Sequence, residues 1–245
     1  MSSGAELFAR YAYPPNALGY CGPDGEGSGL ALGATGAGTE RIPELAPAFD
    51  GAWPYLELLA TTLGATDPLD AHVVEAYWIG GPALERVEAP AFGSWLAERF
   101  DGQPGVDWRL VRSMIDAGSL PHHSFHVLAV YPWLGLLRAG HEGRPLEVLD
   151  RCRIRWGTVV AVEEGAAVVR CRLLTWDGRS LALGEPVEER VGTAFEGRIS
   201  VPGLAPGDRV ALHWGWLCGR LQAKQVEHLR AATRRHLELV SATAT

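Results

Sequence analysis

Residues 151–174 read RCRIRWGTVVAVEEGAAVVRCRLL and mark the place where the periodicity of the chain changes. Two valine-rich runs, Arg153–Val162 and Ala166–Leu174, are joined by Glu163-Glu164-Gly165, which is a hairpin signal. Further short strand-like runs follow, and an amphipathic segment over residues 222–239 closes the chain. This part of the sequence predicts a small barrel of short antiparallel strands with a helix packed beside it.

Before that stretch the pattern is helical, from residue 5 to about residue 149. Helices are predicted over residues 5–13, 42–49, 52–63, 68–80, 82–87, 90–100 and 107–117, and over 120–139 with a break at Pro132. The first helix is expected to stop at Pro14-Pro15, and the glycine-rich segment 22–38 is expected to be a loop. The predicted fold class is α+β, with a helical domain over 1–149 and a barrel with its C-terminal helix over 150–245.

The composition bounds the function. The formal net charge is −7 with a pI near 5.6, which disfavours a nucleic-acid partner. No apolar run approaches the ~20 residues that span a bilayer, and the N-terminus does not resemble a signal peptide, so no membrane insertion and a cytoplasmic location are expected. The four cysteines are then expected to stay reduced and free to act as metal ligands.

The segment 119–133, SLPHHSFHVLAVYPW, holds three of the eight histidines: His122, His123 and His126. On a helix, His122 and His126 share one face at i, i+4, a spacing that can place two imidazoles on one metal ion. The alternative is a helix start whose imidazoles cap the helix, stack on aromatic rings or bond to carbonyl groups. A metal site would need a further ligand, for which the candidates are His72, His141, Glu142, Cys152 and His213.

The C-terminal part resembles a known family. The run GDRVALHWGWLCGRLQAKQVEHLR resembles the end of the HypC/HupF-type nickel–iron hydrogenase maturation chaperones. The matching positions are Pro206, Gly207, Asp208, Val210, His213, Gly215, Trp216 and Leu221. The run RCRIRWGTVVAV resembles the family's opening segment, with Cys152 in the place of the cysteine that follows the initiator methionine. The family has proline where Trp156 precedes Gly157, and its cysteine is terminal where Cys152 is internal.

This resemblance, over residues 151–240, implies a HypC-like barrel and an accessory protein for metalloenzyme maturation. It implies an iron ligand at Cys152 assisted by His213, with iron carried alone or as an iron–diatomic fragment. The implied partner is the hydrogenase large subunit or another maturation protein. The N-terminal half, with LFARYAYPPNALGYCGP, resembles an uncharacterised bacterial family in which the two halves occur together.

Two other functions stay open. One is a non-haem iron or other metal-dependent enzyme, with a site between the domains built from His122, His126 and a barrel residue. The other is an interaction module that has kept the barrel shape and lost its ligand. Arg151, Arg153 and Arg155 flank Cys152 in the sequence, and arginines near a thiol lower its pKa. A solvent-accessible Cys152 is therefore expected to alkylate faster than Cys171.

Overall fold

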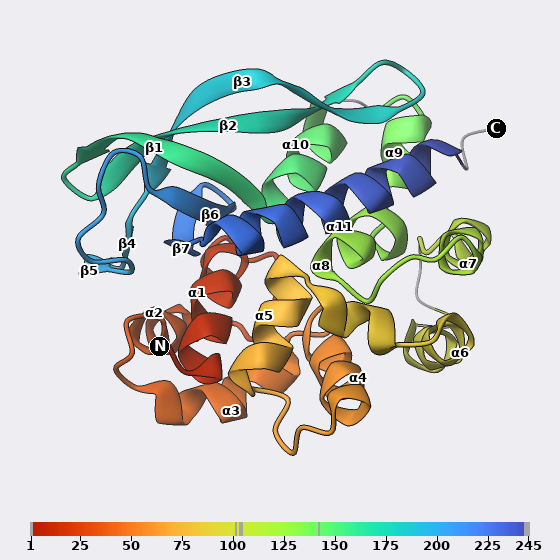
Figure 1. Ribbon diagram of the computed structural model, residues 1–245, viewed down its shortest axis with the longest axis horizontal. Coiled ribbons are helices and arrows are strands. Elements are labelled where there is room, and N and C mark those ends of the chain that lie inside the picture. The colour runs from red at the N-terminus through yellow and green to blue at the C-terminus, as the bar shows by residue number, and fades with distance from the viewer. Residues whose placement is uncertain (1, 101, 103–104, 142, 243–245) are drawn as a thin grey trace.

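The computed structural model describes residues 2–100, 102, 105–141 and 143–242. Helices occupy the first 152 residues, strands follow, and one long helix ends the chain (Figure 1). The helices are α1 (Gly4–Ala17), α2 (Gly27–Ala34), α3 (Ile42–Leu45), α4 (Trp53–Leu63), α5 (Ala71–Ile79), α6 (Ala89–Phe100), α7 (Trp108–Asp116), α8 (His123–Phe125), α9 (Trp133–Arg138), α10 (Gly143–Cys152) and α11 (Ala223–Ala242). Short 3-10 turns are η1 (Thr39–Arg41), η2 (Ala46–Ala48) and η3 (Pro82–Arg86), and η4 (His126–Val130) is π-helical. The mixed α and β class predicted from the sequence is confirmed.

The strands form one main sheet whose pairing closes on itself. Its members are β1 (Arg155–Glu163), β2 (Ala166–Trp176), β3 (Leu181–Gly192), β6 (Arg209–His213) and β7 (Trp216–Arg220), and a separate pair is β4 (Ala194–Phe195) with β5 (Arg198–Ile199). The order is β1-β2-β3-β7-β6, and β6 pairs back onto β1. All pairs are antiparallel except β3 with β7, which meet in parallel at Gly192 and Trp216. Alternate residues such as Val159, Val169 and Val210 point inward and form a small core of their own.

A larger core joins the helices to the sheet. It contains Phe8 and Trp78 from the N-terminal helices, Leu174 from β2 and Leu229 from α11. In Figure 1, α11 runs across the molecule with strands on one side and helices on the other. α10 crosses the predicted domain boundary at residues 149/150. The division into two domains stays a prediction.

Two local predictions were wrong. α1 continues through Pro14-Pro15 for one more turn, because the prolines stand in its last turn and both are buried there. The glycine-rich segment contains α2, whose Leu30 and neighbours are buried. A Cβ at Gly33 would come within 2.5 Å of Ile42 Cδ1, so this glycine lets α3 approach closely. Tertiary packing therefore outweighs the low helix propensity of glycine.

The histidine segment has an unusual backbone. His122 is the N-cap of α8, and the π-helical turn η4 begins at His126. The amide of Tyr131 donates to the carbonyl of His126 at 3.0 Å, and Tyr131 then adopts the extended conformation that a following proline favours. The expected break at Pro132 is present. π-Helical turns are rare and are frequent at functional sites.

None of the helices in the described ranges combines the length and the apolar character that are needed to cross a bilayer.

Candidate metal centre

Three side chains that are distant in the sequence meet between the helices and the main sheet. His123 begins α8, Cys152 ends α10 and His213 ends β6. Each offers one ligand atom, and the three atoms lie within 4.8 Å of one another. All three residues are buried, with at most 7 % of their surface exposed. One member of the histidine run thus joins the cysteine and the histidine of the C-terminal part.

His213 is oriented as a metal ligand would be. Its Nδ1 lies 2.7 Å from the carbonyl oxygen of Tyr11, which can only accept, so Nδ1 carries the proton. Its Nε2 is then the unprotonated nitrogen. This atom is buried and has no hydrogen-bond partner among the described residues. Burial also lowers the pKa of the ring, so the imidazole stays neutral. A buried lone pair without a partner is costly unless a cation or a donor meets it.

His123 takes part in a chain of three hydrogen-bond contacts, and its neutral ring and Tyr77 together have one proton too few to make all three. Its Nδ1 lies 3.0 Å from Tyr77 Oη, and Tyr77 Oη lies 2.5 Å from the carbonyl oxygen of Gly51. Its Nε2 lies 2.8 Å from the carbonyl oxygen of Cys152. These three contacts need three protons, because both ends are carbonyl acceptors. A phenol and a neutral imidazole together supply two, and burial lowers the pKa of His123 to about 4.

The shortage would be removed if Nε2 of His123 held a metal ion and the carbonyl of Cys152, now 2.8 Å from that nitrogen, moved aside. Nδ1–H then donates to Tyr77 Oη, and the Tyr77 hydroxyl donates to the carbonyl of Gly51. Tyr77 would then have both a donor and an acceptor, and Nε2 would need no proton. Histidine ligands in metalloproteins commonly donate their other N–H to a carbonyl or a similar acceptor in this way.

The Cys152 thiol is the third ligand. Burial raises its pKa, and the nearby Cys21 adds to the rise, whereas the indole N–H of Trp214 opposes it. The thiol is therefore protonated at neutral pH in the metal-free protein. A bound metal ion reverses this, because coordination deprotonates a thiol outright. The ring of Trp78 packs against both imidazoles, at centroid distances of 4.6 Å from His123 and 5.8 Å from His213.

The arginines do not activate Cys152, so that expectation was wrong. Arg153 and Arg155 are fully buried and both pair with Asp150, at 2.8 Å and 3.5 Å. Arg151 forms an ion pair within α10. Cys152 ends a helix instead of beginning a strand, and the raised pKa of its thiol has burial as its main cause, with Cys21 and Trp214 as the neighbours that act on it. Neighbours in sequence are therefore not neighbours in space here.

The order of thiol reactivity is predicted to be the reverse of the expected one. Cys21 is the only thiol of the four that is not buried, and its pKa is raised to about 11. Cys171 also has a pKa of about 11, and that of Cys152 is higher still. With iodoacetamide at pH 8 and peptide mass spectrometry, we expect Cys21 to be labelled first and Cys152 last. Labelling of Cys152 ahead of Cys21 would contradict its burial.

His122 belongs to a different network. Its ring accepts from the amide of Ser124, as the cap of α8, and its Nδ1 lies 2.7 Å from Ser124 Oγ. Ser124 Oγ lies 2.7 Å from Nδ1 of His236, on α11. For His122 the capping interpretation is therefore confirmed. Of the other candidate ligands, His72 and His141 are not in the group, and Glu142 lies outside the described residues.

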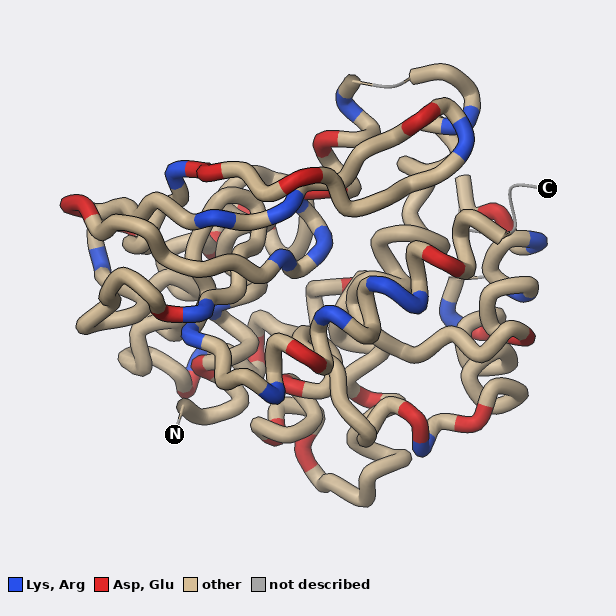
Figure 2. The backbone as a smooth tube through the Cα atoms, turned by 45° about the horizontal axis from the view of Figure 1, so that its top comes forward, with Lys and Arg blue, Asp and Glu red and all other residues tan. Residues whose placement is uncertain are grey.

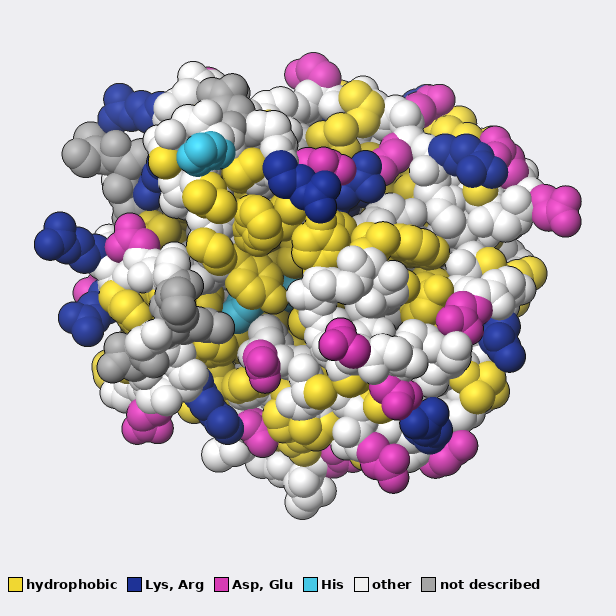
Figure 3. Space-filling model, turned by 180° about the vertical axis from the view of Figure 1, so that it is seen from behind, with side chains coloured by type: hydrophobic (Ala, Val, Ile, Leu, Met, Phe, Trp, Pro, Cys, Tyr) yellow, Lys and Arg dark blue, Asp and Glu magenta, His cyan; other side chains and the backbone are white. Residues whose placement is uncertain are grey.

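His126 faces a small cavity next to the centre. Its Nδ1 lies 3.0 Å from Tyr55 Oη, and its buried Nε2 has no partner within the described ranges. The cavity has a volume of about 320 Å³, and His126, Cys21, Tyr131 and Gly51 are among its lining residues. Figure 3 shows a histidine side chain at the base of a hollow on this molecule's rear face. His122 and His126 therefore bond to different partners, Ser124 and Tyr55, and neither belongs to the ligand group found among the described residues.

Gly51 connects this cavity to the metal centre. A Cβ on Gly51 would lie 2.8 Å from Tyr131 Oη and 2.9 Å from His126 Nε2. The absence of a side chain therefore leaves a position within hydrogen-bond distance of both groups. The carbonyl of the same residue accepts the Tyr77 hydrogen bond. The sequence did not identify Gly51, Tyr77 or Tyr11, because an isolated glycine and aromatic residues in helices are typical of ordinary packing.

No curated protein and no solved structure matches this chain. One family model matches residues 1–245 as a single unit, so the assignment of residues 151–240 to the HypC/HupF-type chaperones was wrong. The pattern behind it is short, and a Pro-Gly-Asp turn leading into a strand is common turn chemistry. His213 is moreover tied to Tyr11 of the N-terminal half. Over its whole length, the chain belongs to the family described as "Family of unknown function (DUF6390)".

Proposed function

We propose that this protein is a metal-dependent enzyme that holds one transition-metal ion through His123, Cys152 and His213. The observation that carries the proposal is the convergence of these ligand atoms within 4.8 Å. The hydrogen bonds of His213 support it, since Nδ1–H donates to the Tyr11 carbonyl and Nε2 has no partner among the described residues. His123 would take the same tautomer, with Nδ1–H toward Tyr77 Oη, once its Nε2 contact with the Cys152 carbonyl is released.

The donor set favours zinc, iron or copper over magnesium or calcium. Thiolate and imidazole suit these transition metals, whereas magnesium and calcium require oxygen ligands. Zinc is the ion we expect first, because cysteine and histidine are its usual ligands. Three protein ligands leave one position for water or substrate, which is the arrangement of catalytic zinc sites. Iron, which the sequence resemblance implied, is a second outcome of the same measurement.

Burial favours a retained ion over a transferred one. A protein that passes a metal to a partner must expose its ligands to that partner, and these three are buried. The maturation function and its partners, the hydrogenase large subunit or another maturation protein, were inferred from the resemblance and have no support in this geometry.

The cavity of about 320 Å³ is the place we propose for the substrate. Its volume suits a small molecule. Tyr131 Oη and His126 Nε2 both face the position beside Gly51 and can hold a polar substrate atom there. Tyr55 Oη makes its hydrogen bond with His126 Nδ1 and with no other described group, so its hydroxyl donates and His126 Nε2 carries a proton. The substrate atom is therefore a hydrogen-bond acceptor.

Metal analysis of protein purified without added metal tests the proposal. We expect close to one zinc, iron or copper ion per chain by mass spectrometry with inductively coupled plasma. Protein without metal should bind one equivalent of Zn²⁺ when it is added. Failure to bind any of the three ions would contradict the proposed function.

Tyr77→Phe is predicted to weaken metal binding without removing a ligand. The change leaves Nδ1–H of His123 without its acceptor, and second-shell changes of this kind lower metal affinity by about 10–100-fold. Competition with a chromophoric chelator measures the effect. Tyr55→Phe is the matched control, because this buried tyrosine bonds to His126 instead. Equal affinity of the two variants would count against the hydrogen-bond chain.

A further inference from the structure

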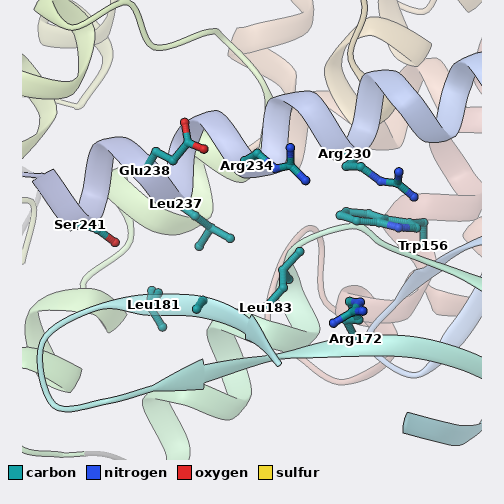
Figure 4. A pocket seen from close by; sticks show the side chains of 10 residues that line it. Trp156, Arg172, Leu181, Leu183, Arg230, Arg234, Leu237, Glu238 and Ser241 are labelled. Carbon is teal, nitrogen blue, oxygen red and sulfur yellow. The ribbon is translucent and has the colours of Figure 1, made fainter. Parts of the chain in front are cut away.

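A second and larger cavity lies between α11 and the hairpin of β2 and β3 (Figure 4). Its volume is about 610 Å³, within the range of small-molecule sites. The lining residues that matter here are Trp156, Arg172, Leu183, Arg230, Arg234 and Leu237. This cavity shares none of its lining residues with the cavity beside the metal centre.

One end of the cavity is strongly basic. Arg172 comes from β2, and Arg230 and Arg234 are one turn apart on α11. None of the three forms an ion pair with a described residue, although the whole chain has a net charge of −7. Figure 2 shows basic positions along α11 and along the strands beside it. Unpaired arginines gathered on an acidic protein indicate a place for an anion.

The arginine side chains are arranged around Trp156. The guanidinium of Arg230 lies over the indole ring, with its carbon 5.9 Å from the ring centroid. In Figure 4, Arg234 extends toward Arg230, and Arg172 lies on the opposite side of Trp156. The cavity also contains Glu238, whose carboxylate points away from the strands in the same view. The positive charge therefore faces the cavity without a facing acid.

The other end of the cavity is apolar. Leu183 on β3 and Leu237 on α11 point toward each other across the gap, and Leu181 extends the same wall (Figure 4). Arg172 already donates to the carbonyl of Gly184 at 2.6 Å, but that contact supplies no negative charge. An inorganic anion would make no use of the leucines, and an apolar molecule would leave Arg230 and Arg234 without a counter-charge. A ligand that contacts both ends has a charged head and an apolar part.

We propose that this cavity binds a small amphiphilic anion, with a phosphate or carboxylate head at the arginines and an apolar chain along the leucines. Arginine recognises both heads through paired N–H donors. The apolar chain lies between the helix and the hairpin, where contact with the leucines removes it from water. The ligand enters as a free molecule, since the site is a cavity and not a flat face.

Titration calorimetry with octyl phosphate below its micelle concentration tests this proposal on the full chain. We expect saturable binding by the unchanged protein and at least about tenfold weaker binding by the Arg230→Gln/Arg234→Gln variant. Arg109→Gln is the control, because this exposed arginine lies on α7, away from the cavity. All replaced arginines are exposed, so folding should persist, and circular dichroism verifies it.

Three comparison probes make the outcome decisive. Inorganic phosphate should bind at least about tenfold more weakly than octyl phosphate, because it has no apolar part. Octyltrimethylammonium, with the opposite charge, should not bind. Equal binding of phosphate and octyl phosphate, no binding of either, or an equal loss in Arg109→Gln would overturn the proposal. Binding to vesicles of phosphatidic acid but not to monomeric octyl phosphate would replace it with a membrane contact.

Discussion

Cys152→Ser is expected to lower the affinity for Zn²⁺ by at least about a hundredfold. A serine hydroxyl does not ionise at neutral pH and is a poor ligand for zinc, so the ion would keep only His123 and His213. Loss of a direct ligand should exceed the ~10–100-fold effect of a second-shell change. Competition with a chromophoric chelator gives the two affinities.

Cys218→Ser provides the matched control. It removes a buried thiol that is free and lies outside the group, so it should leave the affinity within about twofold of the unchanged protein. An equal loss in both variants would mean that the change acts through folding and not through coordination.

The affinity for Zn²⁺ should also rise with pH. The pKa of the Cys152 thiol is raised, so binding must displace its proton. The pKa values of His213 and His123 are lowered, the latter to about 4, so neither ring competes at neutral pH. Zn²⁺ affinity should therefore rise about tenfold per pH unit from pH 6 to pH 8. In Cys152→Ser this slope should disappear.

Asp150→Ala is expected to lower the free energy of unfolding by about 3–5 kcal/mol. Asp150 accepts from Arg153 at 2.8 Å and from the amide of Leu174 at 2.7 Å, and Arg155 lies 3.5 Å away. Both arginines are fully buried. The substitution leaves Arg153 without its carboxylate and Arg155 with Glu189 alone. Urea denaturation, with the slope checked for constancy, measures the change.

Glu163→Ala is the control for that prediction. Glu163 pairs with Arg190 at the surface of the same sheet, and exposed pairs contribute about 0–1 kcal/mol. If Asp150→Ala lowered the free energy of unfolding by no more than Glu163→Ala does, the buried arginines would not depend on Asp150, and the prediction would be wrong.

The sequence predicted the elements whose own residues determine them. α4 and α7 lie within the predicted helices, and the β1–β2 hairpin turns at the predicted Glu163-Glu164-Gly165. α2 was missed, because its helix depends on packing against α1 and α3 and not on local propensity. The passage of α1 through Pro14-Pro15 has the same origin, since burial of the two rings outweighs the lost hydrogen bonds.

The candidate site was predicted by residue type but not by arrangement. His123, Cys152 and His213 were all named, yet the helical spacing favoured His122 with His126. His122 is the N-cap of α8 and has an extended backbone, so it stands outside the helix on which the i, i+4 spacing was counted. Its ring caps α8 through the amide of Ser124, whereas the ring of His126 bonds to Tyr55. The groups that orient the ligands, Tyr11 and Tyr77, come from helices far away in the chain. Only the tertiary fold brings them to the site.

X-ray absorption spectroscopy of the zinc-loaded protein tests the central claim most directly. The account predicts one sulfur at about 2.3 Å and two imidazole nitrogens at about 2.0–2.1 Å from the ion. The sulfur contribution should be absent from Cys152→Ser and present in Cys218→Ser. A first shell of nitrogen and oxygen alone in the unchanged protein would contradict a centre built from His123, Cys152 and His213.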